Sequence, residues 1–294
     1  MKNTLGKLGV WSFIDNYSAT EAAEFAQRVE AWGYSALWLP EAVGRDPFSI
    51  IGYLAGQTTK LVFATGIANI YARDPMATNA ARKTLGELAP GRFILGLGVS
   101  HAPMVSDLRG HDYKKPVTQM RSYLERMESA FYMGPEAEEQ APILIGALRT
   151  NMLNLSAKQA QGAHPYFVTA EHTAKARELI GDKALLCPEQ AILLETDSEK
   201  ARFAARQHMG TYLSLPNYRN NLLELGFNND DFENGGSDRL VDAIVAWGDE
   251  STIRARINDH WQAGADHVCI QALRTDGEMA PDTELLELLA PNQQ

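Results

Sequence analysis

The 294-residue chain has few of the residues that build metal centres and disulfide frameworks. It contains two cysteines and seven histidines, and these are not spaced as zinc ligands. Cys187 and Cys269 lie far apart, each in an apolar strand-like run, and we interpret them as buried free thiols. Nucleophile-elbow and Walker motifs are also absent. These absences argue against a metal hydrolase or an acyl transferase, and we predict no metal site.

Long apolar runs and basic clusters are missing as well. No stretch approaches the roughly 18 consecutive apolar residues of a membrane span, and the N-terminus lacks the basic and apolar regions of a signal peptide. The formal net charge is −10, with no lysine or arginine cluster, which disfavours phosphate contacts with nucleic acids. We therefore expect a cytoplasmic protein that acts on a small molecule and has no membrane or nucleic-acid partner.

The sequence does contain a repeated alternation of apolar runs and helical segments. Its clearest unit spans 61–101, where an apolar run ending at Ile67 is followed by a polar turn, a helical run and a second apolar run after Gly91. Both runs are almost continuously apolar, as strands covered on two faces are. The unit therefore indicates two parallel strands joined by a helical crossover.

Eight such strand-like runs occur along the chain: 7–13, 36–40, 61–67, the run after Pro90-Gly91, 141–148, 165–169, 191–195 and 267–273. After the seventh, helical runs at 198–213, 216–225 and 237–246 lengthen the connection around a disordered-looking segment, 228–236. We predict an α/β fold, a (β/α)8 TIM-like barrel formed by a single domain over residues 1–294. An open doubly wound sheet is disfavoured because no glycine-rich phosphate-binding turn follows the first strand.

Small and polar residues follow several strands at their carboxyl ends, where parallel α/β folds bind ligands. The candidates are Glu41 after the second strand; Gly66, Ile67, Ala68 and Asn69 after the third; Gly98, Ser100 and His101 after the fourth; and Gly146, Ala147 and Leu148 after the fifth. The glycines can admit a ligand close to the backbone, or they can serve a strand bulge.

Two of these side chains can exchange protons. A histidine beside a strand end titrates near neutral pH, so His101 is a candidate acid or base, with a surface or structural role as the alternative. Glu41 can bind a ligand or act as an acid or base, and it can equally cap a helix or form an ion pair. The backbone at Gly146-Ala147 can approach a phosphate or the edge of a ring.

Four motifs taken together resemble the luciferase-like monooxygenase superfamily. They are Trp-Leu-Pro-Glu at 38–41, Ala-Thr-Gly-Ile at 64–67, Arg-Asp-Pro at 73–75, and Leu-Ala-Pro-Gly-Arg-Phe-Ile-Leu-Gly-Leu-Gly at 88–98. Their order and spacing carry the resemblance, which is closest to the branch of oxidoreductases that use the deazaflavin coenzyme F420.

The resemblance implies a bacterial-luciferase-like barrel whose carboxyl-terminal mouth binds a flavin or deazaflavin, within a homodimer. It implies a non-proline cis peptide at Gly66-Ile67 behind the ring, Glu41 at the polar edge of the cofactor, and the 146–148 backbone beside the phosphate chain. His101 stands where some deazaflavin dehydrogenases carry a glutamate proton donor.

The implied reaction is hydride transfer between coenzyme F420 and a small organic substrate, either an alcohol/carbonyl pair or an activated alkene. Binding would fall to the residues at 66–69, 98, 100 and 146–148, and proton transfer to His101, assisted by Glu41 or Ser100. Two alternatives stay open: an FMN-dependent monooxygenase, and a non-catalytic barrel that binds a flavin.

Overall fold

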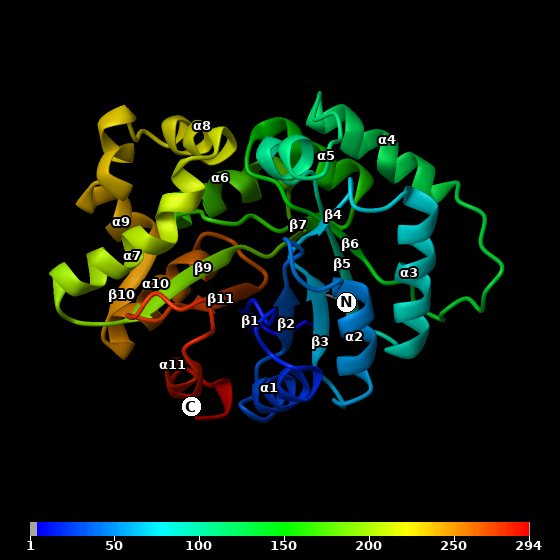
Figure 1. The fold of residues 1–294 in the computed structure, drawn as a ribbon, viewed down its shortest axis with the longest axis horizontal. Coiled ribbons are helices and arrows are strands. Elements are labelled where there is room, and N and C mark those ends of the chain that lie inside the picture. The colour runs from blue at the N-terminus through cyan, green and yellow to red at the C-terminus, as the bar shows by residue number, and fades with distance from the viewer. Residues whose placement is uncertain (1–4, 294) are drawn as a thin grey trace.

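Parallel strands form a ring at the centre of the computed structural model, which describes residues 5–293. Figure 1 shows these strands with helices outside them. In spatial order the ring runs through β1 (Leu8–Trp11), β2 (Ala36–Leu39), β3 (Val62–Thr65), β5 (Phe93–Gly98), β6 (Ile143–Ile145), β7 (Gly162–Ala163), β8 and β9 (Leu185–Leu186 and Glu189–Leu194), and β11 (Val268–Ala272). A short strand, β4 (Ala68–Asn69), also pairs with β5.

The ring closes along the segment formed by β8 and β9. On one side the Cys187 N–H donates to the Ala163 carbonyl (2.9 Å), and on the other the Cys269 N–H donates to the Pro188 carbonyl (3.0 Å). Residues 185–194 therefore act as one barrel strand, with β7 and β11 as its neighbours. The predicted (β/α)8 barrel is confirmed.

Helices cover the outer face of the ring: α1 (Ala19–Ala31), α2 (Pro47–Ala55), α3 (Pro75–Leu88), α4 (Pro116–Glu128), α5 (Thr150–Gln159), α6 (Ala170–Ile180), α10 (Glu250–Gln262) and α11 (Thr283–Leu288). Side-chain caps fix several starts, because a first turn leaves amide groups without helical partners. Ser18 caps α1, while Asp46 and Asp74 cap α2 and α3, each just before a proline at the first helical position.

The long connection after β9 is ordered throughout. It contains α7 (Ser198–Leu213), α8 (Pro216–Glu224), the 3-10 helix η2 (Asn229–Gly235), α9 (Asp238–Ile244) and β10 (Val245–Gly248). In Figure 1, α7, α8 and α9 gather at the opposite end of the molecule from α3 and α4. This connection therefore covers one side of the barrel mouth.

Two expectations for this connection are wrong. The segment 228–236 is not disordered, because the Asn228 side chain accepts from the Asp230 N–H and Asp231 accepts from Ser237 and Arg239. The helix expected at 237–246 ends at Ile244, because the following residues extend and pair with β9 as β10. Apolar runs of this length do not distinguish strand from helix.

The sixth strand lies earlier than predicted. Gly162 and Ala163 pair with β6 and β8, whereas 165–169 is irregular and includes Phe167 at a φ of 61°. A Cβ on Gly162 would lie 2.1 Å from the Leu185 carbonyl oxygen, so the close pairing requires glycine there. The apolar residues at 166–168 resemble a strand, but they pack at the barrel mouth.

Inward-facing residues fill the barrel below its mouth. They alternate with residues that face the helices, as strand geometry requires, and they include Trp38, Ile94, Leu144 and both cysteines. Both cysteines are buried, as expected. Within residues 5–293, no helix has the length and apolar character needed to cross a bilayer.

Six of the seven histidines lie in the protein interior or at its cavities. Burial lowers the pKa of each of the six to about 4, because a charged imidazole loses its hydration; they are His101, His164, His172, His208, His260 and His267. The folded protein thus keeps these six rings neutral at pH 7.

We predict that the folded state loses stability as the pH falls from 6.5 toward 4. Histidines protonate near pH 6.5 in the unfolded chain, whereas these six protonate near pH 4 in the folded protein. Between these two pH values the unfolded chain binds more protons, so acid favours unfolding. Glu189 acts in the opposite direction, because burial raises its pKa to about 8. The free energy of unfolding, from urea titrations, should be roughly 3 kcal/mol or more lower at pH 5 than at pH 7. Equal values at both pH values would contradict this prediction.

Candidate functional site

A bulge interrupts the third barrel strand between β3 and β4. At this point the Thr65 hydroxyl accepts from the Gly96 N–H (2.9 Å) and donates to the Gly96 carbonyl (2.7 Å), so the side chain takes the place of a backbone neighbour. The next peptide bond, Gly66-Ile67, is cis, as the family resemblance implies. Regular pairing resumes when Ala68 pairs with Leu97.

Neighbouring strands hold both peptide groups of the bulge. The Trp11 indole N–H donates to the Gly66 carbonyl (2.9 Å), and the Gly66 N–H donates to the Leu39 carbonyl (2.8 Å). The Glu41 N–H donates to the Ile67 carbonyl (3.2 Å). The position of the bulge is therefore fixed from β1 and from the end of β2.

The Ile67 side chain occupies space that two glycines leave open. A Cβ on Gly98 would lie 2.4 Å from Cγ1 and Cδ1 of Ile67, and one on Gly146 would lie 3.3 Å from its Cγ2. Both glycines were predicted to admit a ligand near the backbone. The structure shows that they first admit Ile67, whose half-buried side chain forms an apolar projection at the mouth.

Beside this projection lies a first cavity of about 290 Å³. It brings together nine of the predicted site residues, Glu41, Gly66, Ile67, Gly98, Ser100, His101, Gly146, Ala147 and Leu148. The other two, Ala68 and Asn69, are buried behind the bulge and do not line it. A concave, largely apolar space at the carboxyl ends of barrel strands is the usual form of a cofactor site.

Glu41 is held in a network of hydrogen bonds. Its carboxylate accepts two hydrogen bonds from Arg73 (2.6 and 2.9 Å) and one from the Asn69 N–H (2.7 Å), while Arg73 also binds Asp46 (2.7 Å). A bidentate arginine fixes the orientation of a carboxylate. These contacts favour the ion-pair alternative, in which Glu41 positions the bulge.

His101 lies at the rim of the first cavity. It follows Ser100, whose φ of 55° turns the chain sharply at the end of β5. The His101 carbonyl accepts a hydrogen bond from the Val105 N–H, within the short π-helix η1 (Pro103–Asp107). The imidazole ring of His101 lies 5.2 Å from the ring of Tyr218. Since burial lowers the pKa of His101 to about 4, the imidazole ring is neutral at pH 7 and carries a nitrogen lone pair.

The sequence did not indicate the tyrosine cluster formed by Tyr166, Tyr212 and Tyr218, which walls the first cavity. The Tyr166 hydroxyl is hydrogen-bonded to the Tyr212 hydroxyl (2.7 Å) and to Gln271 Oε1 (2.8 Å), and the rings pack 5.2 to 6.3 Å apart. These residues come from the irregular segment after β7, from α7 and from α8. No local pattern could have shown that they meet.

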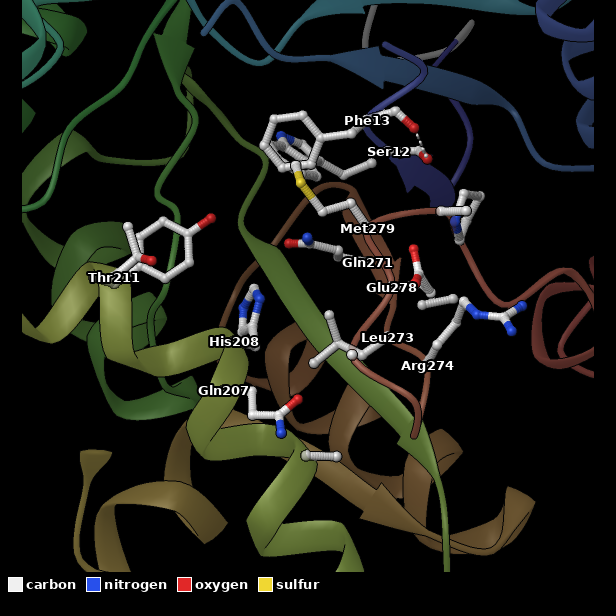
Figure 2. A pocket seen from close by; sticks show the side chains of 17 residues that line it. Ser12, Phe13, Gln207, His208, Thr211, Gln271, Leu273, Arg274, Glu278 and Met279 are labelled. Carbon is white, nitrogen blue, oxygen red and sulfur yellow. Dashed lines mark hydrogen bonds between the residues drawn. The ribbon is translucent and has the colours of Figure 1, made fainter. Parts of the chain in front are cut away.

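A second cavity, of about 270 Å³, adjoins the first, and the two share Trp11, Phe13, Thr211 and Tyr212 as wall residues. Figure 2 shows Thr211 and His208 of α7 on one side of it, and Gln271 and Leu273 on the other. Met279 lies against Phe13 at its edge (Figure 2). The mouth thus offers two neighbouring spaces, a first beside Ile67 and a second under α7.

The fold and the site together define a barrel protein with a ligand cavity at its carboxyl-terminal mouth, beside a cis-peptide bulge. A family model described as "luciferase-like monooxygenase" matches residues 7–267. The chain therefore belongs to the luciferase-like monooxygenase family.

Three similar proteins illustrate the range of this family. A Mycobacterium tuberculosis protein, named as a candidate coenzyme F420-dependent oxidoreductase, is 32% identical over 103 residues, 35% of this chain and 30% of that protein. This chain thus matches less than a third of that relative.

Two solved structures share the fold over nearly the whole chain. An F420-dependent secondary alcohol dehydrogenase, in complex with an F420-acetone adduct, has a TM-score of 0.75 at 14% identity and covers 98% of this chain and 97% of that one. The oxygenating constituent of 3,6-diketocamphane monooxygenase from Pseudomonas putida, in complex with FMN, has a TM-score of 0.70 at 16% identity over 96% of both chains. At these identities the similarity establishes the fold alone.

We predict that Gly98→Ala displaces Ile67 and damages the first cavity. The new methyl group would overlap the Ile67 side chain, and overpacking of this kind costs about 1–3 kcal/mol. Thermal unfolding should show this loss, and ligand binding in the cavity should weaken about tenfold or more.

Gly210→Ala is the matched control, because Gly210 lies on an exposed face of α7 and its Cβ would meet no atom within 4 Å. It should leave binding unchanged and stabilise the protein slightly, by up to about 1 kcal/mol. Equal effects of the two substitutions would show that Gly98 is not needed to accommodate Ile67.

Proposed function

We propose that this protein is an F420-dependent oxidoreductase that transfers a hydride between the deazaflavin and a small organic substrate. The observation that carries the proposal is the Ile67 projection on a cis bulge, facing a cavity whose walls are the ends of four barrel strands. An apolar projection of this kind suits the flat face of a tricyclic ring. Relatives named for coenzyme F420 support the choice of cofactor.

The residues around the first cavity fit the polar parts of such a cofactor. The backbone at 146–148 leads into α5, whose N-cap residue Arg149 makes no side-chain cap, so first-turn amides remain open to a phosphate. The His172 ring lies 2.6 Å from the Leu148 carbonyl. Because a carbonyl can only accept, His172 donates and fixes this segment.

We assign proton transfer to His101. Its neutral ring can take the proton of a substrate hydroxyl, while the bound deazaflavin would supply the ring carbon that exchanges the hydride. Ser100 lines the cavity beside it, and Glu41, engaged by Arg73, fits a positioning role better than a direct one. The barrel walls would exclude water and align the two reactants.

The second cavity suits the substrate, because it shares wall residues with the first and offers the Thr211 hydroxyl, the Gln271 amide and the His208 ring. Arg274 and Glu278 line it too, so these groups suit a small polar organic molecule, such as an alcohol, aldehyde, ketone or enone. We also propose that the protein forms a homodimer, as the resemblance implies, which light scattering would test.

We expect the purified, cofactor-free protein to bind coenzyme F420 at micromolar concentration or tighter, and FMN at least about tenfold more weakly. Quenching of each ligand's fluorescence measures both affinities in one protocol. Preferential FMN binding with oxygen consumption would instead support the monooxygenase alternative, for which an FMN complex of the same fold is known. Binding of neither would contradict the proposal.

We further expect His101→Phe to lower kcat by about 10² to 10⁴, because it removes a general base and keeps an aromatic ring beside Tyr218. Its affinity for coenzyme F420 should change less than about threefold. His111→Phe is the control, because His111 is exposed and does not line either cavity. The rate is followed as F420 absorbance with the best alcohol or carbonyl substrate from a screen. An unchanged kcat would remove His101 from the mechanism.

A further inference from the structure

We infer that His164 is a ligand-binding residue whose Nε2 atom accepts a hydrogen bond from an N–H or O–H group of the molecule in the first cavity. His164 follows β7 and lines the cavity together with Trp11 and Gly66. The nature of that molecule rests on the proposed function. The state of the His164 ring follows from its own contacts.

The tautomer of His164 is set by its backbone neighbour. Its Nδ1 atom lies 2.7 Å from the Cys187 carbonyl oxygen, and a carbonyl can only accept a hydrogen bond. The proton of the neutral ring must therefore sit on Nδ1, which leaves Nε2 with a bare lone pair. Burial lowers the pKa of His164 to about 4, so this acceptor persists at neutral pH.

That acceptor has no partner among the described residues, although His164 is only 1% exposed. Buried acceptors of this kind are rare, and leaving one unpaired is costly. The ring cannot turn away easily, because it stacks on Trp38 at a centroid distance of 4.5 Å and an interplanar angle of 20°. The unpaired atom is therefore held in place.

The Nε2 atom of His164 lies beside the bulge. A Cβ on Gly66 would lie 3.2 Å from it, and His164, Gly66 and Ile67 line the same cavity. A ligand in that cavity with a hydrogen-bond donor beside Gly66 would satisfy Nε2, whereas a carbonyl there would be repelled.

A second histidine in the same core shows what a purely structural role looks like. His267 also contacts Trp38 and has its Nδ1 bonded to a backbone carbonyl, that of Gly6 (2.6 Å). Its Nε2, however, accepts from the Trp38 indole N–H (3.1 Å), and it does not line the first cavity. The core thus pairs one of the two imidazoles completely. The other belongs to a residue that lines the first cavity, and its Nε2 atom has no partner among the described residues.

The test compares His164→Phe, His164→Gln and His267→Phe in binding titrations with coenzyme F420 and FMN, and in KM for the best substrate. His164→Phe removes the acceptor and should weaken the ligand that donates to it by about tenfold. His164→Gln retains an acceptor oxygen and should recover binding to within about threefold of the wild type. His267→Phe should destabilise the core but change binding less than twofold.

The constant that changes in His164→Phe identifies the molecule that carries the hydrogen-bond donor. A tenfold rise in the F420 or FMN dissociation constant places the donor on the cofactor, whereas a tenfold rise in KM alone places it on the substrate. Either result supports the inference. Folded His164→Phe with both constants unchanged overturns it.

Nitrogen-15 NMR of the wild-type chain provides a second measurement that needs no variant. The free protein should show His164 with a protonated Nδ1 and a bare Nε2, and the Nε2 signal should shift when the cofactor or substrate binds. A proton on Nε2 in the free chain, or a signal that no bound ligand moves, overturns the inference. A wild-type chain that binds neither cofactor contradicts the proposed function, while the tautomer still decides whether Nε2 is an open acceptor.

Discussion

The hydrogen bonds of the Thr65 hydroxyl are the contact on which the site depends. Where a barrel strand bulges away from its neighbour, the backbone N–H and C=O groups of both strands lose their hydrogen-bond partners. Burying such unpaired groups costs free energy. Thr65 supplies a donor and an acceptor to Gly96 at the point of departure. The strand can therefore project Ile67 into the mouth and resume pairing within a few residues, without opening the barrel.

This arrangement explains why small residues cluster at the neighbouring strand ends. A Cβ on Gly96 would lie 1.9 Å from the Thr65 carbonyl oxygen, and one on Gly98 would overlap Ile67. The glycines therefore follow from the bulge: the strand next to it needs room for a displaced backbone and then for a displaced side chain. Trp11 and Glu41 complete the support by bonding the two carbonyl groups that the bulge turns outward.

The sequence predicted those parts of the site that are local in the chain. The strand ends at 66–69, 98–101 and 146–148 were visible because each is a short polar or glycine-containing segment after an apolar run, and the closed barrel brings most of them to one cavity. Ala68 and Asn69 do not line the cavity, because the chain pairs with β5 again just after the bulge and both residues are buried there. The cis peptide came from the family resemblance, since no composition rule indicates it.

The remaining wall could not be predicted, because it depends on contacts between distant segments. Tyr166 and Tyr212 are 46 residues apart and meet only because the connection after β9 folds back over the mouth. Such a pair leaves no periodic signal in either segment. His164 was hidden for a related reason: it lies in an apolar run, where a histidine resembles an ordinary core residue until its two ring nitrogens are found to have unequal partners.

The two histidines of the first cavity are uncharged at pH 7, because burial lowers the pKa of His101 and of His164 to about 4. The Glu41 carboxylate is paired with Arg73. Behind this wall, burial raises the pKa of Glu189 to about 8, so that its carboxyl group stays protonated. In a space of low polarity a fixed charge would act strongly on any charge that develops nearby. A neutral wall instead leaves that balance to the ligand that the cavity binds.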